Sequence, residues 1–334
     1  MRRKAAYAAM EASLLTPGRL RLITKAAKLR YEARLSQTRI AAELKLSQAT
    51  VSRLLHQADD LGLVRTTVTP PPGVHTELES QLEQRFGLDE AVVTDTPSGS
   101  APLTPALGAA GAAYLESVLT EGDRLGFSSW SSASLAVAES IGALPSRRVA
   151  QVVQVLGGLG ASSVQGRANR LVDRLAAMTG AEAKYLAAPG LMDTPQAAAA
   201  VLADGSLRPV AAAWENLTVL LTGIGATEPS PLYRASGNAI SKNDEDRLRA
   251  AGAVGDVLLR YFDAAGQLVE SDLYSRVVGI PLNQLRAVPR RIGVAGGPRK
   301  AEAILAASRG GWINVLVTEA ETARTVLRTH HGQP

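Results

Sequence analysis

Residues 35–55 read Leu35-Ser-Gln-Thr-Arg-Ile-Ala-Ala-Glu-Leu-Lys-Leu-Ser-Gln-Ala-Thr-Val-Ser-Arg-Leu-Leu55. Ser36 and Ser47 are good helix N-caps and predict short helices over 37–44 and 48–60. Two such helices joined by a three-residue turn define a helix-turn-helix. In the second helix, an i, i+3, i+4, i+7 pattern predicts an inner apolar face made of Val51, Leu54, Leu55 and Ala58.

The outward face of the second helix carries side chains suited to a DNA major groove. Arg53 can pair with both acceptors of guanine, and Gln48 can pair with the edge of adenine. The hydroxyls of Ser47 and Thr50, together with the helix N-terminus, can hold a phosphate. An ordinary helical hairpin that binds no nucleic acid is the alternative. The predicted DNA-binding residues are Ser36, Gln37, Ser47, Gln48, Ala49, Thr50, Ser52 and Arg53.

The distribution of charge supports a polyanionic partner for this segment. Residues 1–70 hold 13 Lys and Arg against 5 Asp and Glu, whereas residues 71–334 hold 23 against 26. The excess positive charge therefore lies in the same part of the chain as the helix-turn-helix. A solvated basic surface would show the same balance, so charge alone does not establish DNA binding.

The composition excludes several classes of protein. The 334 residues are 46% hydrophobic and 20% charged, which is typical of a globular protein with room for two domains. The absence of cysteine excludes disulfides and cysteine-based metal sites. No apolar run is long enough to span a bilayer, and no secretory signal follows the basic N-terminus. We expect a cytoplasmic protein without membrane association, metal or cofactor.

Proline-rich sequence divides the chain into two parts. The run Thr69-Pro70-Pro71-Pro72-Gly73 favours a stiff, extended spacer. We expect helices over 3–15 and 19–34 and extended chain over 61–68 before it, and an amphipathic helix over 75–86 after it. The predicted organisation is a helix-turn-helix DNA-binding domain (1–68), a Pro-rich linker (69–76) and an effector-binding and oligomerisation domain (77–330).

From residue 91 onward, apolar strands alternate with amphipathic helices. This alternation predicts an α/β protein in which an N-terminal all-α domain precedes a large, doubly wound, mostly parallel sheet. The expected strands are 91–94, 123–127, 149–156, 217–221, 291–295 and 313–317, and the expected helices are 103–119, one ending at 141, 167–179, 298–309 and 320–327.

Glycine and serine loops follow several of these strands, at the edge where open α/β sheets bind ligands. Four serines surround Trp130; their hydroxyls and amides could cradle a phosphate while the indole covers an apolar ligand face. Gly296 and Gly297 lead into a helix with Arg299 and Lys300, a second candidate anion site. Asp256 could accept hydrogen bonds from sugar hydroxyls. The predicted effector residues are Ser128, Ser129, Trp130, Ser131, Ser132, Gly157, Gly158, Gly160, Gly223, Gly225, Asp256, Gly296, Gly297 and Lys300.

Each of these residues also has a purely structural interpretation. Glycines in α/β turns mostly serve the backbone, Trp130 could simply pack, and Lys300 could be solvated. Asp272 and Arg276 are weaker candidates in a later loop.

Residues 35–55 resemble the helix-turn-helix of the SorC family of sugar-responsive regulators, and five glycine-containing motifs in family order extend the resemblance over nearly the whole chain. They are Gly157-Gly-Leu-Gly160, Leu221-Thr-Gly-Ile-Gly225, Ala250-Ala-Gly-Ala-Val-Gly-Asp256, Ala295-Gly-Gly-Pro-Arg-Lys-Ala301 and Gly310-Gly-Trp-Ile-Asn-Val-Leu-Val-Thr318. The resemblance implies a domain related to sugar-phosphate isomerases and deaminases, a phosphorylated sugar or polyol as effector, and a homodimer or homotetramer.

Two departures from the family pattern affect the details. Lys45 stands where the family usually has a turn glycine, and a left-handed backbone there costs a non-glycine residue on the order of 1 kcal/mol. Many members have a Ser-Trp-Gly-x-Thr phosphate loop, whereas Trp130 is followed here by Ser131, Ser132 and Ala133. An unphosphorylated polyol is therefore an alternative effector.

We predict a transcription regulator of a carbohydrate or polyol catabolic operon, controlled by a sugar, sugar-phosphate or polyol. The alternative is a sugar-phosphate isomerase or deaminase with an appended DNA-binding head. Proton transfer needs a positioned base, but none of the four histidines, His56, His75, His330 and His331, falls in a glycine loop. Glu228 is the one titratable group of its loop, and the Asp-Gly-His segment of the related deaminases is absent. We therefore expect no enzymatic activity, and two heads per dimer would read a pseudo-palindromic operator.

Overall fold

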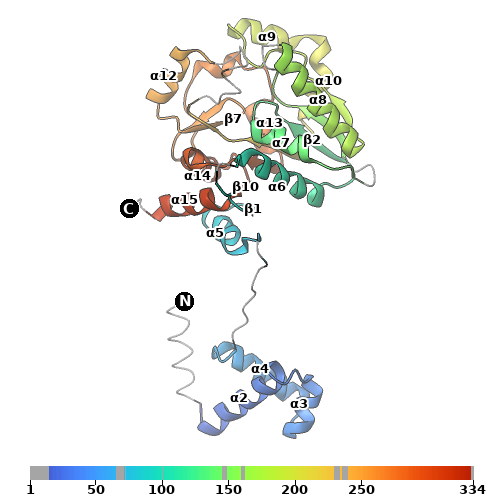
Figure 1. The fold of residues 1–334 in the computed structure, drawn as a ribbon, viewed down its shortest axis with the longest axis vertical. Coiled ribbons are helices and arrows are strands. Elements are labelled where there is room, and N and C mark those ends of the chain that lie inside the picture. The colour runs from blue at the N-terminus through green and yellow to red at the C-terminus, as the bar shows by residue number, and fades with distance from the viewer. Residues whose placement is uncertain are drawn as a thin grey trace. The chain divides into compact units, whose positions relative to one another are not determined.

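The computed structural model describes residues 15–64, 71, 73–99, 101–144, 149–158, 162–228, 234 and 240–331, without the side chains of 162–165, 167, 168, 330 and 331. The chain divides into two compact units, residues 1–69 and 70–334 (Figure 1). The predicted helix over 3–15 and most of the extended segment before the linker lie outside the described residues, as does Gly160.

The first unit contains three described helices, α2 (Pro17–Tyr31), α3 (Gln37–Leu44) and α4 (Gln48–Asp60). The side chains of Thr16, Ser36 and Ser47 cap them, each accepting a hydrogen bond from a backbone N–H of the first turn. The last two helices begin and end at the predicted residues. Their apolar faces meet in a small core made of Ile23, Ala26, Ala27, Ile40, Ala41, Val51, Leu54, Leu55 and Ala58.

The turn between α3 and α4 passes through Lys45, which adopts a left-handed conformation with φ 53° and ψ 46°. Its backbone N–H closes α3 by bonding to the carbonyls of Ala41 and Ala42. The left-handed turn between the two helices is thus built on a lysine.

Replacing Lys45 with glycine should stabilise the first unit. Glycine adopts positive φ without steric cost, so the free energy of unfolding should rise by about 0.5–1 kcal/mol, partly offset by the greater freedom of the unfolded chain. Chemical denaturation followed by circular dichroism measures the change. A Lys25→Gly control in the middle of α2 should instead lower stability by about 1 kcal/mol. A loss of stability in Lys45→Gly would contradict the left-handed turn.

The second unit is built on a seven-stranded parallel sheet in the order β1-β10-β9-β5-β2-β3-β4. The predicted doubly wound fold class is confirmed. The strands are β1 (Glu90–Thr94), β2 (Asp123–Phe127), β3 (Val149–Gln154), β4 (Glu182–Lys184), β5 (Val219–Gly223), β9 (Arg290–Val294) and β10 (Val315–Glu319).

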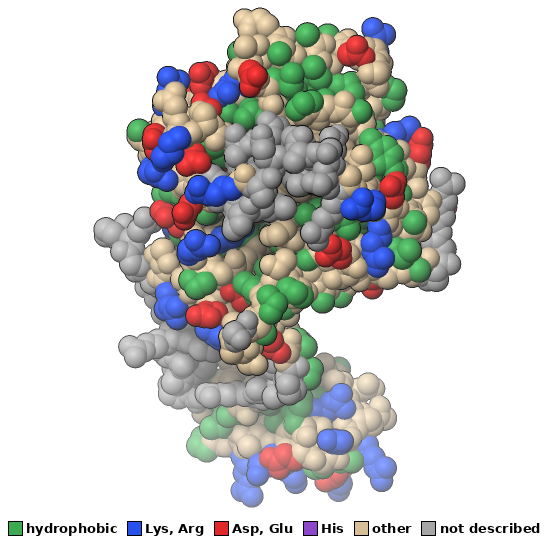
Figure 2. Space-filling model, turned by 45° about the horizontal axis from the view of Figure 1, so that its top comes forward, with side chains coloured by type: hydrophobic (Ala, Val, Ile, Leu, Met, Phe, Trp, Pro, Cys, Tyr) green, Lys and Arg blue, Asp and Glu red, His purple; other side chains and the backbone are tan. Residues whose placement is uncertain are grey.

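Helices cover both faces of this sheet and create two apolar cores. One face packs against α6 (Leu103–Val118), α7 (Ser132–Ser140) and α8 (Ser162–Thr179). The other packs against α5 (Thr76–Phe86), α10 (Arg208–Trp214), α14 (Ala301–Arg309) and α15 (Ala320–His331). Figure 2 shows acidic and basic side chains interspersed over the surface of this unit. Within the described residues, no helix is both long and apolar enough to cross a bilayer.

Several short elements were not predicted from the sequence. A three-stranded antiparallel sheet joins β6 (Gly225–Ala226), β7 (Gly255–Val257) and β8 (Arg260–Phe262). Leu258 and Leu259, both at positive φ, form the tight turn between β7 and β8. The predicted helix over 298–309 is a 3-10 turn, η3 (Pro298–Lys300), followed by α14. The other elements that were not predicted are β4, α10, α9 (Pro195–Ala203), α12 (Lys242–Ala250), α13 (Leu282–Ala287), η1 (Gly205–Leu207) and η2 (Asp272–Arg276).

Candidate functional site

The outward face of α4 presents the predicted DNA-reading side chains to solvent. Gln48, Ala49 and Arg53 are exposed, and Ser52 is half-buried beside them. Ser36 and Gln37 begin α3 and complete the predicted set. The Ser47 hydroxyl caps α4 and lies 2.8 Å from the Thr50 hydroxyl, so the two oxygens form a polar pair at the helix N-terminus. Backbone N–H groups and hydroxyls there are suited to a phosphate oxygen.

One basic residue beside this face could not be found from sequence periodicity. The guanidinium of Arg19, on α2, donates a 2.9 Å hydrogen bond to Gln57 Oε1 on α4. Because 38 residues separate the two, no local spacing indicates the contact. It places a second positive charge at the flank of α4.

Arg53→Ala should remove sequence discrimination rather than affinity in general. If Arg53 makes a bidentate contact with a base, the difference in binding free energy between operator and scrambled DNA should shrink by about 1–3 kcal/mol. Fluorescence anisotropy with both duplexes at one salt concentration measures the difference. Lys25→Ala, which removes an exposed charge from α2, is the control, and its discrimination should match the wild type. Unchanged discrimination in Arg53→Ala would refute the assignment.

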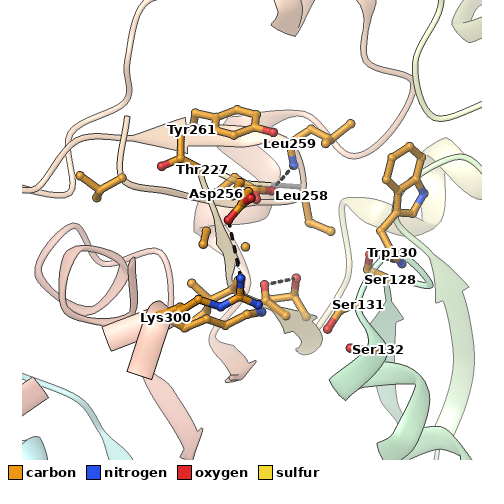
Figure 3. Close-up of a pocket in the computed structure, with 18 of the residues that line it drawn as sticks. Ser128, Trp130, Ser131, Ser132, Thr227, Asp256, Leu258, Leu259, Tyr261 and Lys300 are labelled. Atoms are coloured by element: carbon orange, nitrogen blue, oxygen red, sulfur yellow. Dashed lines mark hydrogen bonds and ion pairs between the residues drawn. The ribbon is translucent and has the colours of Figure 1, made fainter. Parts of the chain in front are cut away.

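The second unit contains a cavity of about 730 Å³ at the carboxyl ends of β2 and β5. The β7–β8 hairpin and η3 close its far side. Figure 3 shows Trp130 and the serines on one wall, facing Asp256, Tyr261 and Lys300 on the other. The lining residues are Ser128, Trp130, Ser131, Ser132, Leu156, Thr222, Gly223, Ile224, Gly225, Ala226, Thr227, Glu228, Arg234, Val254, Asp256, Leu258, Leu259, Tyr261, Arg299, Lys300 and Glu302.

Two predicted glycines make room for polar side chains that face the cavity. A Cβ at Gly223 would lie 2.1 Å from Ser131 Oγ, and a Cβ at Gly225 would lie 1.8 Å from Asp256 Oδ1. Both distances are far below van der Waals contact. These glycines therefore serve the pocket by letting a hydroxyl and a carboxylate approach the backbone closely.

Asp256 and Lys300 form the charged wall of the pocket. Burial raises the pKa of Asp256 to about 6, although the Leu259 N–H and the Lys300 charge both act to lower it. The Lys300 ammonium donates a 2.7 Å hydrogen bond to the Ile224 carbonyl, and burial lowers its pKa. A carboxylate acceptor and an ammonium donor in one recess are suited to a polyhydroxylated ligand.

The serine wall mixes pocket residues with structural ones. Ser131 caps α7 by accepting a hydrogen bond from Ser134 N, so the N-terminus of α7 opens at the cavity. Ser128 and Ser132 also line the cavity, whereas Ser129 is fully buried and does not. The Trp130 indole N–H donates to the Gly157 carbonyl at 2.7 Å. Trp130 thus both packs and lines the pocket.

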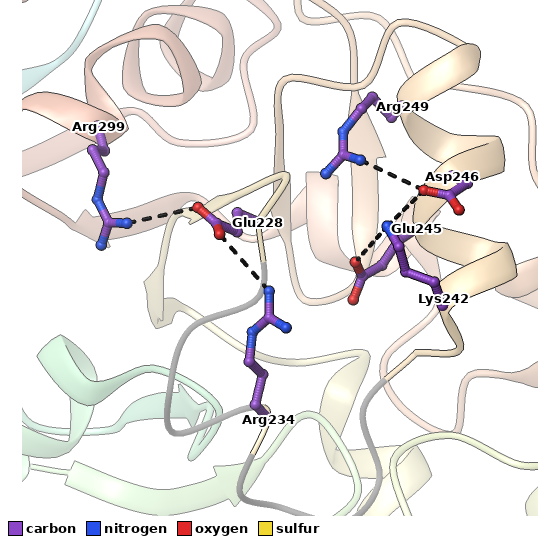
Figure 4. Close-up of polar contacts among 7 residues, drawn as sticks. All are labelled: Glu228, Arg234, Lys242, Glu245, Asp246, Arg249 and Arg299. Atoms are coloured by element: carbon purple, nitrogen blue, oxygen red, sulfur yellow. Dashed lines mark hydrogen bonds and ion pairs between the residues drawn. The ribbon is translucent and has the colours of Figure 1, made fainter.

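Charged groups of both signs surround the mouth of the pocket. Glu228 lies 3.8 Å from an Arg234 nitrogen and 3.6 Å from an Arg299 nitrogen (Figure 4). All three side chains are mostly exposed, so each pair contributes little to stability. A second set of ion pairs lies on α12, whose residues do not line the cavity, and links Lys242 to Glu245 and Asp246, and Asp246 to Arg249.

Other predicted residues do not line this cavity. Gly157 and Gly158 pack against the chain at 188–190, where a Cβ at Gly157 would lie 2.4 Å from the Pro189 carbonyl oxygen. Gly296 and Gly297 adjoin the Glu319 carboxylate instead of the pocket. Asp272 and Arg276 pair elsewhere, with Arg247 and Asp244 respectively. Thr222, Thr227 and Tyr261 line the pocket and were not predicted.

Comparison with known proteins identifies the family. A family model described as "Putative sugar-binding domain" matches residues 71–328. The sorbitol operon regulator of Klebsiella pneumoniae is 32% identical over 314 residues, which cover 92% of this chain and 98% of that protein. The chain belongs to the SorC family of sugar-binding transcriptional regulators. The predicted resemblance is therefore confirmed.

Other relatives cover this SorC-family chain to a similar extent. The deoxyribonucleoside regulator of Bacillus subtilis is 32% identical over 307 residues, covering 92% of this chain and 97% of its own. The transcriptional regulator LsrR of Escherichia coli is 30% identical over 90% of this chain and 92% of its own. The crystal structure of full-length SorC from Klebsiella pneumoniae superposes with a TM-score of 0.70, at 32% identity, over 92% of this chain and 98% of that one.

Proposed function

We propose that the protein is a transcription regulator that binds operator DNA through α3 and α4 and is controlled by a sugar, sugar-phosphate or polyol bound in the 730 Å³ cavity. Its target is a carbohydrate or polyol catabolic operon. The observation that carries the effector assignment is the meeting of the Ser131 cap, Asp256 and Lys300 in one recess. A volume within the roughly 300–1,000 Å³ typical of small-ligand sites supports it.

The two walls of the cavity divide the recognition of the ligand. On one wall, an anionic group or the end of a polyol chain binds at the N-terminus of α7. There the hydroxyls of Ser131 and Ser132 and the backbone N–H groups donate hydrogen bonds to it. Asp256 accepts hydrogen bonds from ligand hydroxyls, while Lys300 donates to an oxygen. Ser131, Asp256 and Lys300 each already form a hydrogen bond within the protein, which reduces the entropy cost of binding.

Binding proceeds without chemical turnover in this proposal. No histidine is among the described residues that line the cavity. The Lys300 ammonium already donates to the Ile224 carbonyl, and the charge of Asp256 acts to keep it protonated. Relatives named as regulators support the same conclusion. A steady turnover of any sugar phosphate by the purified protein, measured by NMR, would contradict it.

The proposed organisation assigns residues 1–68 to DNA binding, 69–76 to a Pro-rich linker and 77–330 to effector binding and oligomerisation. A homodimer or homotetramer would present paired heads to a pseudo-palindromic operator in the cytoplasm. An effector changes operator affinity only to the extent that it prefers one of the two arrangements of the subunits.

A thermal-shift screen against phosphorylated and plain sugars and polyols is the first test. A specific ligand at 100 times its dissociation constant stabilises the folded state by about 2.7 kcal/mol. A hit should then change operator affinity in an anisotropy assay. Hits confined to unphosphorylated polyols would show that the cavity does not bind a phosphate group. A ligand that binds but leaves operator affinity unchanged would refute the regulatory role.

A further inference from the structure

A buried carboxylate at the end of β10 is not used by the pocket itself. Glu319 is 1% exposed, and among the described residues no basic side chain forms an ion pair with it. Its Oε1 accepts hydrogen bonds from the Thr322 backbone N–H at 3.2 Å, the Thr322 hydroxyl and the Gly297 N–H at 3.2 Å. A buried carboxylate without a counter-ion needs hydrogen-bond donors to replace water. Loss of any of these hydrogen bonds is therefore more costly than loss of a hydrogen bond at the surface.

The Gly296–Gly297 loop is shaped around this carboxylate. A Cβ at Gly296 would lie 2.1 Å from Glu319 Oε2. Gly297 has a φ of +95°, and its N–H also donates to Thr322 Oγ1 at 2.8 Å. The Gly297 N–H, in a loop that the sequence indicated as an anion site for a ligand, is therefore taken by a carboxylate of the protein.

The same loop leads directly to the charged wall of the pocket. The Gly297 carbonyl accepts a 2.9 Å hydrogen bond from Lys300 N, which forms the short η3 turn. From that turn the Lys300 side chain reaches the Ile224 carbonyl and faces Asp256 (Figure 3). The backbone position of Lys300 thus depends on a loop that is anchored at Glu319 and Thr322.

The other side of the anchor is the first turn of α15. Glu319 precedes α15 and caps it, and Thr322 lies in its first turn. Further along the helix, the Leu327 carbonyl accepts a 3.3 Å hydrogen bond from the Arg85 guanidinium on α5. Continuous contacts therefore connect the pocket, through η3 and α15, to the helix that follows the linker.

We propose that Glu319 and Thr322 are positioning residues for Lys300, and that through them the charged wall of the pocket and the first turn of α15 are mechanically coupled. The proposal rests on the proposed function, because it concerns the wall that would meet the effector. It adds the contact that connects the pocket to α15, which is the one between the Gly297 loop and Glu319 and Thr322.

The first test measures the placement of Lys300 without any ligand. Full-length protein is treated with a limiting amine-acylating reagent, and mass spectrometry follows the labelling of Lys300 relative to exposed Lys25. Thr322→Val removes the hydroxyl and should raise Lys300 labelling roughly fivefold, as expected for the loss of one hydrogen bond. Thr322→Ser restores the hydroxyl and should label as the wild type does. Equal labelling in Thr322→Val would overturn the proposal.

Two matched glycine variants separate the contact from general loosening. Gly296→Ala places a methyl group against the Glu319 carboxylate and should also raise Lys300 labelling. Gly205→Ala, where no atom lies within 4 Å of the added Cβ, should leave it unchanged. If both glycine variants change the labelling equally, Lys300 is responding to stability and not to Glu319.

The second test applies the perturbation from the pocket side. In Lys300→Met, amide hydrogen exchange should speed up at residues 297 and 322 and leave α6 at its wild-type rate, because coupling acts in both directions. An α15 that exchanges as in the wild type would overturn the coupling. Both readouts are independent of ligand, so a failed effector screen would count against the proposed function and leave this inference standing.

Discussion

Replacing Lys300 with methionine should weaken effector binding by roughly 10- to 100-fold, the loss expected when a charged hydrogen-bond donor is removed from a binding site. Methionine keeps most of the volume of the side chain, so the cavity should keep its shape. The variant loses the ammonium that donates to the Ile224 carbonyl and faces Asp256. Any ligand oxygen that relies on that donor loses its partner.

Asp256 should respond to the same substitution. The Lys300 charge acts to lower the pKa of this carboxyl, which burial has already raised to about 6. Without the ammonium the pKa rises further, so the carboxyl remains protonated to higher pH and accepts fewer hydrogen bonds from ligand hydroxyls near neutrality. The affinity of Lys300→Met should therefore recover partly as the pH is raised.

Isothermal titration calorimetry measures the loss of affinity and its pH dependence. A ligand from the screen is titrated at several pH values between about pH 6 and pH 8.5. Lys242→Met is the matched control, since Lys242 is an exposed lysine on α12 that does not line the cavity. Circular dichroism confirms that each variant is folded. Wild-type affinity in Lys300→Met would show that the ligand does not contact this wall.

Leu54→Ala should unfold the first unit and abolish operator binding. Leu54 is fully buried in a core to which the described part of this unit contributes nine buried apolar residues. A leucine truncated at such a site costs about 2–5 kcal/mol. A core of this size provides only a few kcal/mol of net stability, so the loss is comparable with the whole. Operator affinity should fall to the detection limit.

Effector binding should survive in the same variant, because the second unit has two apolar cores of its own. Two-transition thermal denaturation, operator anisotropy and effector calorimetry on one preparation test this separation. Leu63→Ala, at a leucine that is 46% exposed, should leave all three measurements near the wild type. Loss of effector binding in Leu54→Ala would show that the two units do not fold independently.

Local sequence signals predicted most of the regular structure. Ser36 and Ser47 cap their helices through their own side chains, and the first residues of α3 and α4 follow from those caps. All the parallel strands except β4 were found, because each is a largely apolar run covered on both faces. The edge strand β4 was missed because its three residues, Glu182–Lys184, form no apolar run. The β7–β8 hairpin was missed because strands of three residues carry no measurable period, and its turn uses two leucines at positive φ instead of Asn or Gly.

Lys45, in the turn between α3 and α4, departs from the family pattern in sequence. Because a lysine stands where the family usually has a glycine, the turn was expected to be slightly adjusted but kept, and in the structure Lys45 adopts the left-handed conformation with φ 53°. The helix still closes through the backbone, because the carbonyls of Ala41 and Ala42 accept the Lys45 N–H whatever the side chain is.

The chain's sequence by itself determined the helix-turn-helix, the α/β class and the candidate residues that follow strands, since each depends on neighbours within about one turn or one strand. The order of short motifs along the chain indicated the family. Only the tertiary structure decided which candidates meet. Ser131, Asp256 and Lys300 converge because parallel strands end at one edge of the sheet and a hairpin folds over it. Gly297 is separated from them because Glu319, 22 residues away, takes its N–H. Spacing along the chain carries no record of such contacts, since a buried carboxylate binds whichever donors the fold brings to it.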